Sequence, residues 1–121
     1  MGLDMYAYTT TENISAVDFP PPKDGKQLFY WRKHPNLHGW MQALYDKKGG
    51  ENEEFNLAGL RLDIEDLDAL EAAVKDDKLP HTVGFFFGES HAEDKLRTLV
   101  FIACAREVIA LGKRVFYYAW W

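Results

Sequence analysis

The stretch QLFYWRKHPNLHGWMQALYDKK, residues 27–48, decides the fold, because it carries an expected strand directly into an expected helix. Its first part, 27–33, is short and aromatic and lies between a glycine and a proline, which is typical of a strand or an extended arm. Pro35 suits the first turn of a helix, where its missing N–H costs no hydrogen bond. Apolar residues then recur three and four positions apart up to Tyr45, and lysines and glycines at 47–50 end the helix.

The chain on either side of this stretch predicts an α+β domain. Residues 3–9 alternate apolar and polar side chains, as in a strand with one buried face, and the Thr-, Pro-, Asp- and Gly-rich segment 10–27 is expected to be a surface loop. Further elements are expected as strands at 60–62, 82–87 and 114–121, a helix that begins at Asp63 and stops before Leu79-Pro80, and a helix from near Ser90 or His91 to Gly112. We expect a single domain over residues 1–121, with three helices packed on a mixed sheet of about four to five strands.

Length and composition exclude several classes of protein. The chain has 121 residues, of which 47% are hydrophobic and 15% aromatic, so it can bury a core without disulfides or a structural metal. Its formal net charge of -5 repels phosphate backbones, and we expect no nucleic-acid partner. The single cysteine, Cys104, cannot form an internal disulfide, which favours a reducing compartment. We expect a cytoplasmic protein with no signal peptide and no contact with a membrane.

Three expected turns lead from a strand into a helix, at Lys33-His34, at Leu62-Asp63 and at 88–90. If the strands run parallel, these turns gather at one edge of the sheet, which is where open sheets bind ligands. The last strand would then end at the same edge and place Trp120 on its rim. This gathering depends on strand direction, which one sequence leaves open.

Two histidines and a serine near these turns are candidates for chemistry. His34 and His38 lie four residues apart, a spacing that puts both imidazoles on one helix face and can hold a metal. The HExxH pattern and a cysteine cluster are both missing, so we expect no metal and no other cofactor. Ser90 follows a glycine but lacks the Gly-x-Ser-x-Gly pattern of a nucleophile. We interpret the histidines as capping or hydrogen-bonding groups and Ser90 as a helix cap.

Charged residues near the first helix suggest an anion site. Arg32 and Lys33 precede the helix N-terminus, where free backbone N–H groups and the helix dipole favour negative charge. Asp4 is an acid on the first expected strand, and it would orient an imidazole or pair with Arg32. The aromatic runs at 85–87 and 116–121 are first of all candidates for both faces of central strands. Some of these rings must still reach the surface, where Tyr and Trp favour partner recognition.

Several blocks of the sequence resemble a family of small phage and bacterial proteins that brings no established activity. The blocks are MGLDMY at 1–6, YWRK at 30–33, His38 with Trp40, Leu79-Pro80 followed by GFFFG at 84–88, and an aromatic C-terminus that ends in Trp. The resemblance implies a phage or prophage origin and the cytoplasm of a bacterial host. It also draws attention to Asp4, Tyr30, Trp31, Arg32, Lys33, His38, Trp40 and the GFFFG turn. The residues before the last Trp are aromatic here and small and polar in the family.

Two hypotheses for function follow. The first is a non-catalytic protein-interaction module that binds a host protein, a phage protein or a second copy of itself through an aromatic surface. The alternative is an enzyme or a small-ligand binder that holds an anionic substrate at the strand-to-helix turns with Asp4, Arg32, His34, His38 and Glu89. The expected partner or ligand contacts are Asp4, Tyr30, Trp31, Arg32, Lys33, His38, Trp40, Glu89, Ser90 and Trp120. A flat aromatic patch supports the first hypothesis, and a concave pocket of converging polar groups supports the second.

Overall fold

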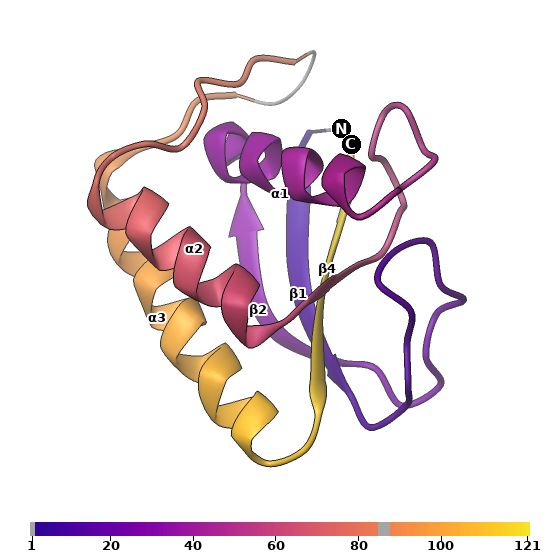
Figure 1. The fold of residues 1–121 in the computed structure, drawn as a ribbon. Coiled ribbons are helices and arrows are strands. Elements are labelled where there is room, and N and C mark those ends of the chain that lie inside the picture. Colours follow the sequence, from indigo (N-terminus) through magenta and orange to yellow (C-terminus); the bar gives the residue numbers. More distant parts are fainter. Residues whose placement is uncertain (1, 85–87) are drawn as a thin grey trace.

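The structure, a computed structural model, describes residues 2–84 and 88–121. In chain order its elements are β1 (Asp4–Thr10), β2 (Lys26–Arg32), α1 (Pro35–Lys47), β3 (Leu60–Leu62), α2 (Ile64–Lys75), α3 (Ala92–Ala110) and β4 (Arg114–Trp120). Figure 1 shows the three helices in front of and beside the sheet, with both ends of the chain at the top. The expected α+β class with three helices is confirmed.

The four described strands form a sheet in the order β2-β1-β4-β3, and each neighbouring pair is antiparallel. The expectation of a mixed sheet is therefore wrong for the described strands. The reason lies in the connections. A plain loop joins β1 to β2, and two helices in succession lie between β3 and β4, so the chain returns to the sheet in the opposite direction.

The strand expected at 82–87 is not found in its first part. Residues 82–84 belong to no strand, and 85–87 lie outside the described residues. The Thr82 N–H donates to the side chain of Asn36 at 3.0 Å, and the Thr82 hydroxyl donates to the carbonyl of Pro80. The segment is thus attached to the start of α1 through side chains. Its β-branched and aromatic composition alone pointed to a strand.

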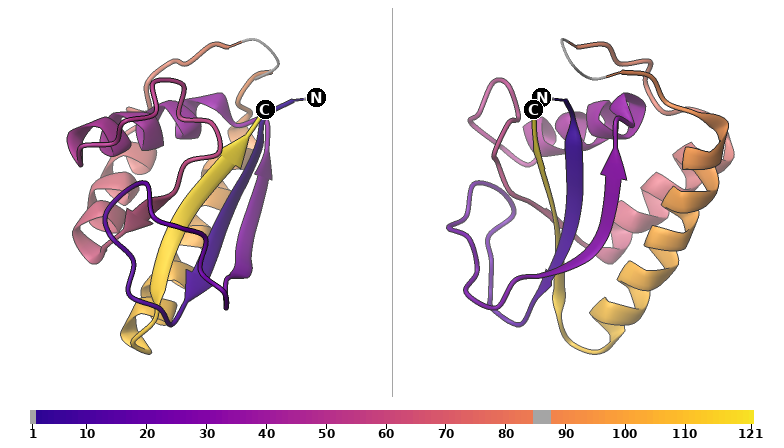
Figure 2. Two further views of the ribbon diagram at one scale, coloured as in Figure 1. Left: turned by 90° about the vertical axis from the view of Figure 1, so that its right-hand side faces the viewer. Right: turned by 180° about the vertical axis from the view of Figure 1, so that it is seen from behind.

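Alternation along β1 decides which face of the sheet is buried. Leu3, Met5 and Ala7 are fully buried and face the helices. They join the core with aliphatic and aromatic residues of all three helices. Figure 2 shows the helices on one face of the sheet, while the other face is left uncovered by helix. We call this second face the open face.

Local signals at the helix starts are confirmed. Pro35 is the first residue of α1. At α2 the Asp63 N–H donates to Asp66 Oδ2 at 2.8 Å, and at α3 the His91 N–H donates to Asp94 Oδ2 at the same distance. Each acid satisfies a backbone N–H that the helix itself leaves free, which is the reason such spacing marks a helix start.

The strand register shows which residues lie at each end of the sheet. The three turns expected to gather at one edge do not all do so. Arg32, Asp4 and Trp120 lie side by side at the upper end of the sheet. Leu62 pairs with Val115, at the start of β4 and therefore at the lower end. The Leu62-Asp63 turn thus lies at the opposite end from the Lys33-His34 turn, because β2 and β3 run in opposite directions. Of the other two turns, the one at 88–90 lies beside the Lys33-His34 turn, and the Leu62-Asp63 turn does not.

Candidate binding surface

Aromatic side chains cover much of the open face. Tyr6 pairs with Tyr30 on one side and with Tyr118 on the other, so three tyrosines form a row across three strands. Tyr8 lies one row below and Trp120 one row above. All five side chains are partly or largely exposed, and Trp120 keeps 48% of its surface accessible. We call Tyr6, Tyr8, Tyr30, Tyr118 and Trp120 the aromatic face.

The rings of the aromatic face hold one another in place. The centroid of Tyr6 lies 5.1 Å from Tyr30, 5.8 Å from Tyr8 and 6.1 Å from Trp120, where the rings meet edge to face. Aromatic pairs at such separations attract beyond their buried area. The rings are therefore held in one arrangement by their own contacts.

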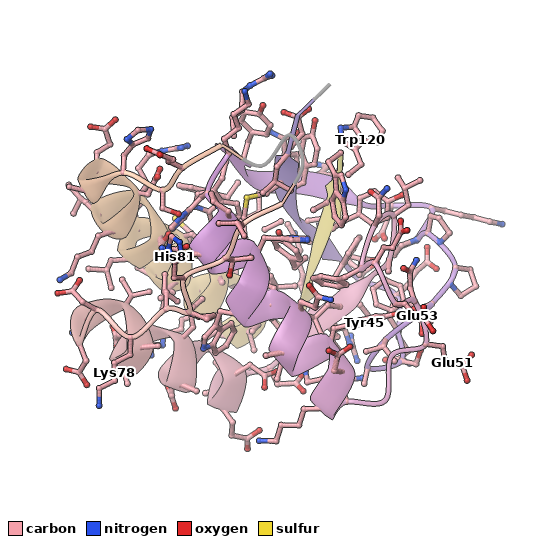
Figure 3. The ribbon with its side chains drawn as sticks, turned by 90° about the horizontal axis from the view of Figure 1, so that it is seen from above. Tyr45, Glu51, Glu53, Lys78, His81 and Trp120 are labelled. Atoms are coloured by element: carbon pink, nitrogen blue, oxygen red, sulfur yellow. The ribbon has the colours of Figure 1, made fainter. Side chains whose placement is uncertain are left out.

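Asp4 organises the upper end of the aromatic face. Its Oδ1 accepts a hydrogen bond from the Tyr30 hydroxyl at 2.6 Å and lies 3.5 Å from the Arg32 guanidinium. Its Oδ2 accepts a bond from the Trp120 indole N–H at 3.3 Å. The bond to Asp4 raises the pKa of Tyr30, which keeps that hydroxyl a donor. The expected pairing of Asp4 with Arg32 is present, and Figure 3 shows Trp120 on the rim.

Trp31 and Trp40 are not part of this surface. Trp31 is fully buried, and its ring lies 4.8 Å from both Phe29 and Phe101 in the core. The expectation of an exposed Trp31 is wrong because neighbouring residues of a strand face opposite sides, and Tyr30 takes the open one. Trp40 is half-buried on α1 and packs against the core.

His34 and Ser90 meet where two turns come together. Their Nδ1 and Oγ atoms lie 2.7 Å apart, and Ser90 Oγ accepts the N–H of Asn36 at 3.1 Å. Ser90 therefore caps α1 rather than the helix that follows it. Asp94 Oδ2 lies 3.9 Å from the same His34 Nδ1, and burial lowers the pKa of His34. Serine and carboxylate approach one ring nitrogen, whereas a catalytic triad uses both.

His38 belongs to the core rather than to a surface. It is fully buried, its Nδ1 lies 2.7 Å from the Tyr117 hydroxyl, and its ring stacks on Phe55 at 5.1 Å. Burial lowers the pKa of His38 to about 4 and raises that of Tyr117 well above its ordinary value. His38 is thus a neutral hydrogen-bonding group, and a direct ligand contact expected from the sequence is not available to it.

Lys33 and Glu89 lie on the two turns that meet. Lys33 is half-buried and packs against Gly88, where a Cβ would stand 2.9 Å from Lys33 Cδ. Gly88 also has a φ of +75°. Both the close approach of Lys33 and this backbone conformation therefore favour glycine here. Glu89 is exposed beside it. Asp4 and Arg32 lie on the open face and the two histidines on the helix side, so the five residues of the enzyme hypothesis do not share one pocket.

Three residues of the aromatic face were missed by sequence reasoning, namely Tyr6, Tyr8 and Tyr118. The signal was present, because Tyr6 and Tyr8 alternate with residues that the same pattern places in the core. Tyr118 lies in an aromatic run whose two faces cannot be separated without the register. Within residues 2–84 and 88–121, the structure has no cluster of three or more potential metal ligands and no helix of the length and apolarity that a membrane crossing requires.

Comparison of the chain with protein-family models, with curated proteins and with solved structures finds no match.

Proposed function

We propose that this chain is a non-catalytic protein-interaction module that binds another protein through its aromatic face. The resemblance noted above supports a phage-type protein, and the single cysteine supports the cytoplasm of a bacterial host as its setting. The observation that carries the proposal is the row of partly exposed tyrosines with Trp120 on a sheet face that none of the described helices covers.

The chemistry of these side chains suits recognition. Tyr and Trp combine a large apolar area with a polar atom, and they dominate binding energy at protein interfaces. Here the hydroxyls and the indole N–H keep the face compatible with water when it is free. Contiguous aromatic area of this kind, rather than single exposed rings, marks an interaction site.

Charge on the strands favours a partner other than a second copy. The four strands carry Lys26, Arg32, Arg61 and Arg114 but only one acid, Asp4. Arg32, Arg61 and Arg114 are at open-face positions, whereas Lys26 pairs with Thr9 on the helix side. Two copies that met through their open faces would bring the three arginines of each copy together. A different protein can supply opposite charge at the rim, where it guides orientation more than it adds affinity.

The anionic-substrate alternative has less geometric support. Ser90 is occupied as a cap of α1, and His38 is enclosed in the core. The cavity that His34 and Ser90 help to line has a volume of about 310 Å³, and Asp77 lines it together with Lys95. Asp77 and Lys95 pair with each other at 3.1 Å, so the lysine charge in that wall is already engaged by an acid rather than offered to an anionic ligand.

Affinity capture with variants of the full chain tests the proposal. Tagged wild-type protein is incubated with bacterial host lysate, and retained proteins are identified by mass spectrometry. We expect Tyr6→Ala and Trp120→Ala to lose a partner that the wild type retains. Leu96→Ala, on the exposed side of α3 and 68% accessible, is the matched control and should retain it. Equal capture by all variants with unchanged circular dichroism would refute the proposal.

Light scattering during gel filtration distinguishes a different partner protein from a second copy of the chain. A concentration-dependent dimer that Tyr6→Ala and Trp120→Ala abolish and Leu96→Ala keeps would show a second copy as the occupant. In that case the claim of a different partner is wrong, although the aromatic face remains the site.

A further inference from the structure

A groove adjoins the lower part of the aromatic face. It has a volume of about 510 Å³ and lies between β1, β4 and the loops 11–25 and 49–59. We call it the lower groove, and its lining residues are Tyr8, Asp18, Phe19, Pro21, Pro22, Gly25, Asn52, Leu57, Ala58, Gly59, Phe116 and Tyr118. We propose that the lower groove binds a cationic side chain, arginine or lysine, of the partner protein. This inference rests on the proposed function and names the chemistry of the partner.

Four aromatic rings surround the lower groove from different directions. Tyr8 stacks on Phe116 at 5.3 Å, with an angle of 23° between the rings. Phe19 stands at 85° to Phe116, and Tyr118 stands at 71° to Tyr8. Rings at these separations contact one another, so a side chain in the lower groove would lie against the outer surface of the ring cluster, where faces as well as edges are presented. A cation is attracted to the negative face of such rings, and this attraction increases as water is removed.

Charge around the lower groove has the sign that a cation requires. Among the described lining residues, Asp18 is the only charged one. The two loops that form the walls carry six acids and one lysine, namely Glu12, Asp18, Asp24, Glu51, Glu53, Glu54 and Lys23. Figure 3 shows Glu51 and Glu53 on the side of the molecule beyond Tyr45. A basic side chain would therefore meet a complementary field over a distance comparable to the screening length.

The arginines of β3 and β4, Arg61 and Arg114, bond to partners outside the lower groove. Arg61 pairs with Asp63 at 3.0 Å and donates to the carbonyl of Ile14 at 2.8 Å. Arg114 donates to the side chain of Asn13. Neither arginine lines the lower groove, so neither neutralises Asp18 within it.

Two lining residues adopt strained backbone conformations. Asp18 has a φ of 55° and Leu57 a φ of 60°, in the left-handed region that non-glycine residues seldom occupy. Leu57 also exposes 55% of its surface although it is apolar. Asp18 is held there because its carboxylate accepts bonds from the Tyr45 hydroxyl and, at 3.0 Å, from the Glu51 N–H. Strain and apolar exposure together are features of binding sites.

A matched pair of small probes tests the charge requirement on the full chain. N-acetyl-arginine amide and N-acetyl-citrulline amide have nearly the same shape, but only the first is cationic. We expect NMR titration to show at least fivefold tighter binding of the arginine probe, with the largest shifts at the amides of Gly25 and Gly59. Equal affinity for the two probes, or shifts confined to other regions, would overturn the proposal.

Variants locate the site independently of overall stability. Gly25→Val should abolish arginine binding by filling the lower groove, and a Cβ there has only ordinary contacts, 3.6 Å from the Pro22 carbonyl oxygen and 3.9 Å from Phe116. Asp18→Asn should weaken binding at least threefold. Because Asp18 also holds a loop, Glu53→Gln provides a second charge change and should weaken binding less. Leu96→Ala is the control and should bind as the wild type does.

A further comparison distinguishes a peptide side chain from a small amine as the source of the cation, and it distinguishes this inference from the proposed function. Choline is compared with 3,3-dimethylbutan-1-ol, its neutral analogue of the same shape. If choline binds in the lower groove and the arginine probe does not, a small quaternary amine is the ligand and the claim of a peptide side chain is wrong. If neither cation binds but Tyr6→Ala still loses the captured partner, this inference fails and the proposed function stands. If the arginine probe binds but no captured partner depends on the aromatic face, the proposed function fails and the cation site in the lower groove stands.

Discussion

At the scale of single residues, strand alternation separates neighbours that look alike in the sequence. Tyr30 and Trp31 are adjacent aromatic residues of β2, yet one joins the aromatic face and the other is fully buried against Phe101. Trp120 stands at the far end of β4 and is half exposed. The same residue type therefore serves the core at one position and the surface at another, and the stability cost of removing it should differ accordingly.

We expect Trp31→Ala to lower the free energy of unfolding by about 3–5 kcal/mol, because it removes a large buried side chain and leaves a cavity. Trp120→Ala should cost about 1 kcal/mol or less, since much of its ring is already in water. Urea denaturation followed by circular dichroism measures both. Equal losses for the two variants would contradict the assignment of Trp31 to the core and Trp120 to the rim.

Burial of His38 makes stability depend on pH. In the fold its pKa is lowered by burial to about 4, whereas the ordinary value is 6.5. The unfolded chain therefore binds a proton at this residue below about pH 6.5 that the folded chain does not bind until about pH 4. The contribution of neutral His38 is fully present above pH 6.5 and is lost progressively as pH falls to 4. A pKa shift of this size corresponds to roughly 3 kcal/mol.

The measurement compares wild-type protein with His38→Gln by urea denaturation at pH 7 and pH 4. The wild type should lose more stability over this range than the variant, because carboxylates titrate in both and cancel in the difference. His81→Gln, at an exposed loop position, is the control and should follow the wild type. An identical loss in His38→Gln would show that His38 does not titrate in this way.

At the scale of elements, single side chains join segments that the backbone leaves apart. Ser90 precedes α3 but caps α1 through the Asn36 N–H, so the two helix starts are fixed to each other. Asp94 near the start of α3 lies close to His34, which precedes α1. The position of α3 relative to α1 is therefore set by polar contacts at one end as well as by the core.

We expect Ser90→Ala to lower the free energy of unfolding by about 1 kcal/mol, the usual cost of a lost helix cap. The matched control is Ser15→Ala, in an exposed loop where the hydroxyl bonds to the nearby Val17 carbonyl, and it should cost a few tenths of a kcal/mol. Thermal melts quantify both variants, and hydrogen exchange at the first turn of α1 reports the cap itself. Unchanged exchange at that turn in Ser90→Ala would contradict the capping role.

At the scale of the whole molecule, local patterns predicted the elements well and their arrangement less well. Proline at the start of α1, the Asp63 cap and the Gly112 stop act through neighbours in sequence, so one chain is enough to place them. Strand direction depends on how connections return to the sheet, which no local pattern encodes. This is why the expected sheet was mixed and the observed one antiparallel, and why the Leu62-Asp63 turn lies at the far end.

The candidate site shows the same division. Asp4, Tyr30, Arg32 and Trp120 were expected contacts, and the structure brings them together at one end of the open face. Trp31 and His38 had equally suggestive sequences but are enclosed. Burial of Trp31 follows from which face of the sheet the helices cover, and burial of His38 follows from how α1 packs against Tyr117 of β4, so the sequence could propose these residues without showing which are exposed.

Charge is also divided unevenly over the molecule, and this division has a measurable consequence. The loops 11–25 and 49–59 concentrate acids around the lower groove, while the strands beside it hold a basic excess. Like charges in a small region repel in the folded chain and are further apart in the unfolded one. The loops should therefore be stabilised by anything that reduces this repulsion.

We expect Glu53→Lys to raise the melting temperature by roughly 1–3 °C at low ionic strength, because it replaces repulsion with attraction among the loop acids. Glu53→Gln removes the charge without reversing it and should give about half of this gain. In 1 M salt, where screening acts over about 3 Å, both gains should vanish. Differential scanning calorimetry at the two salt concentrations measures the change. A gain that persists in high salt would mean that local packing at Glu53, rather than the charge of the loops, controls their stability, and the electrostatic argument for a cationic partner in the lower groove would lose its support.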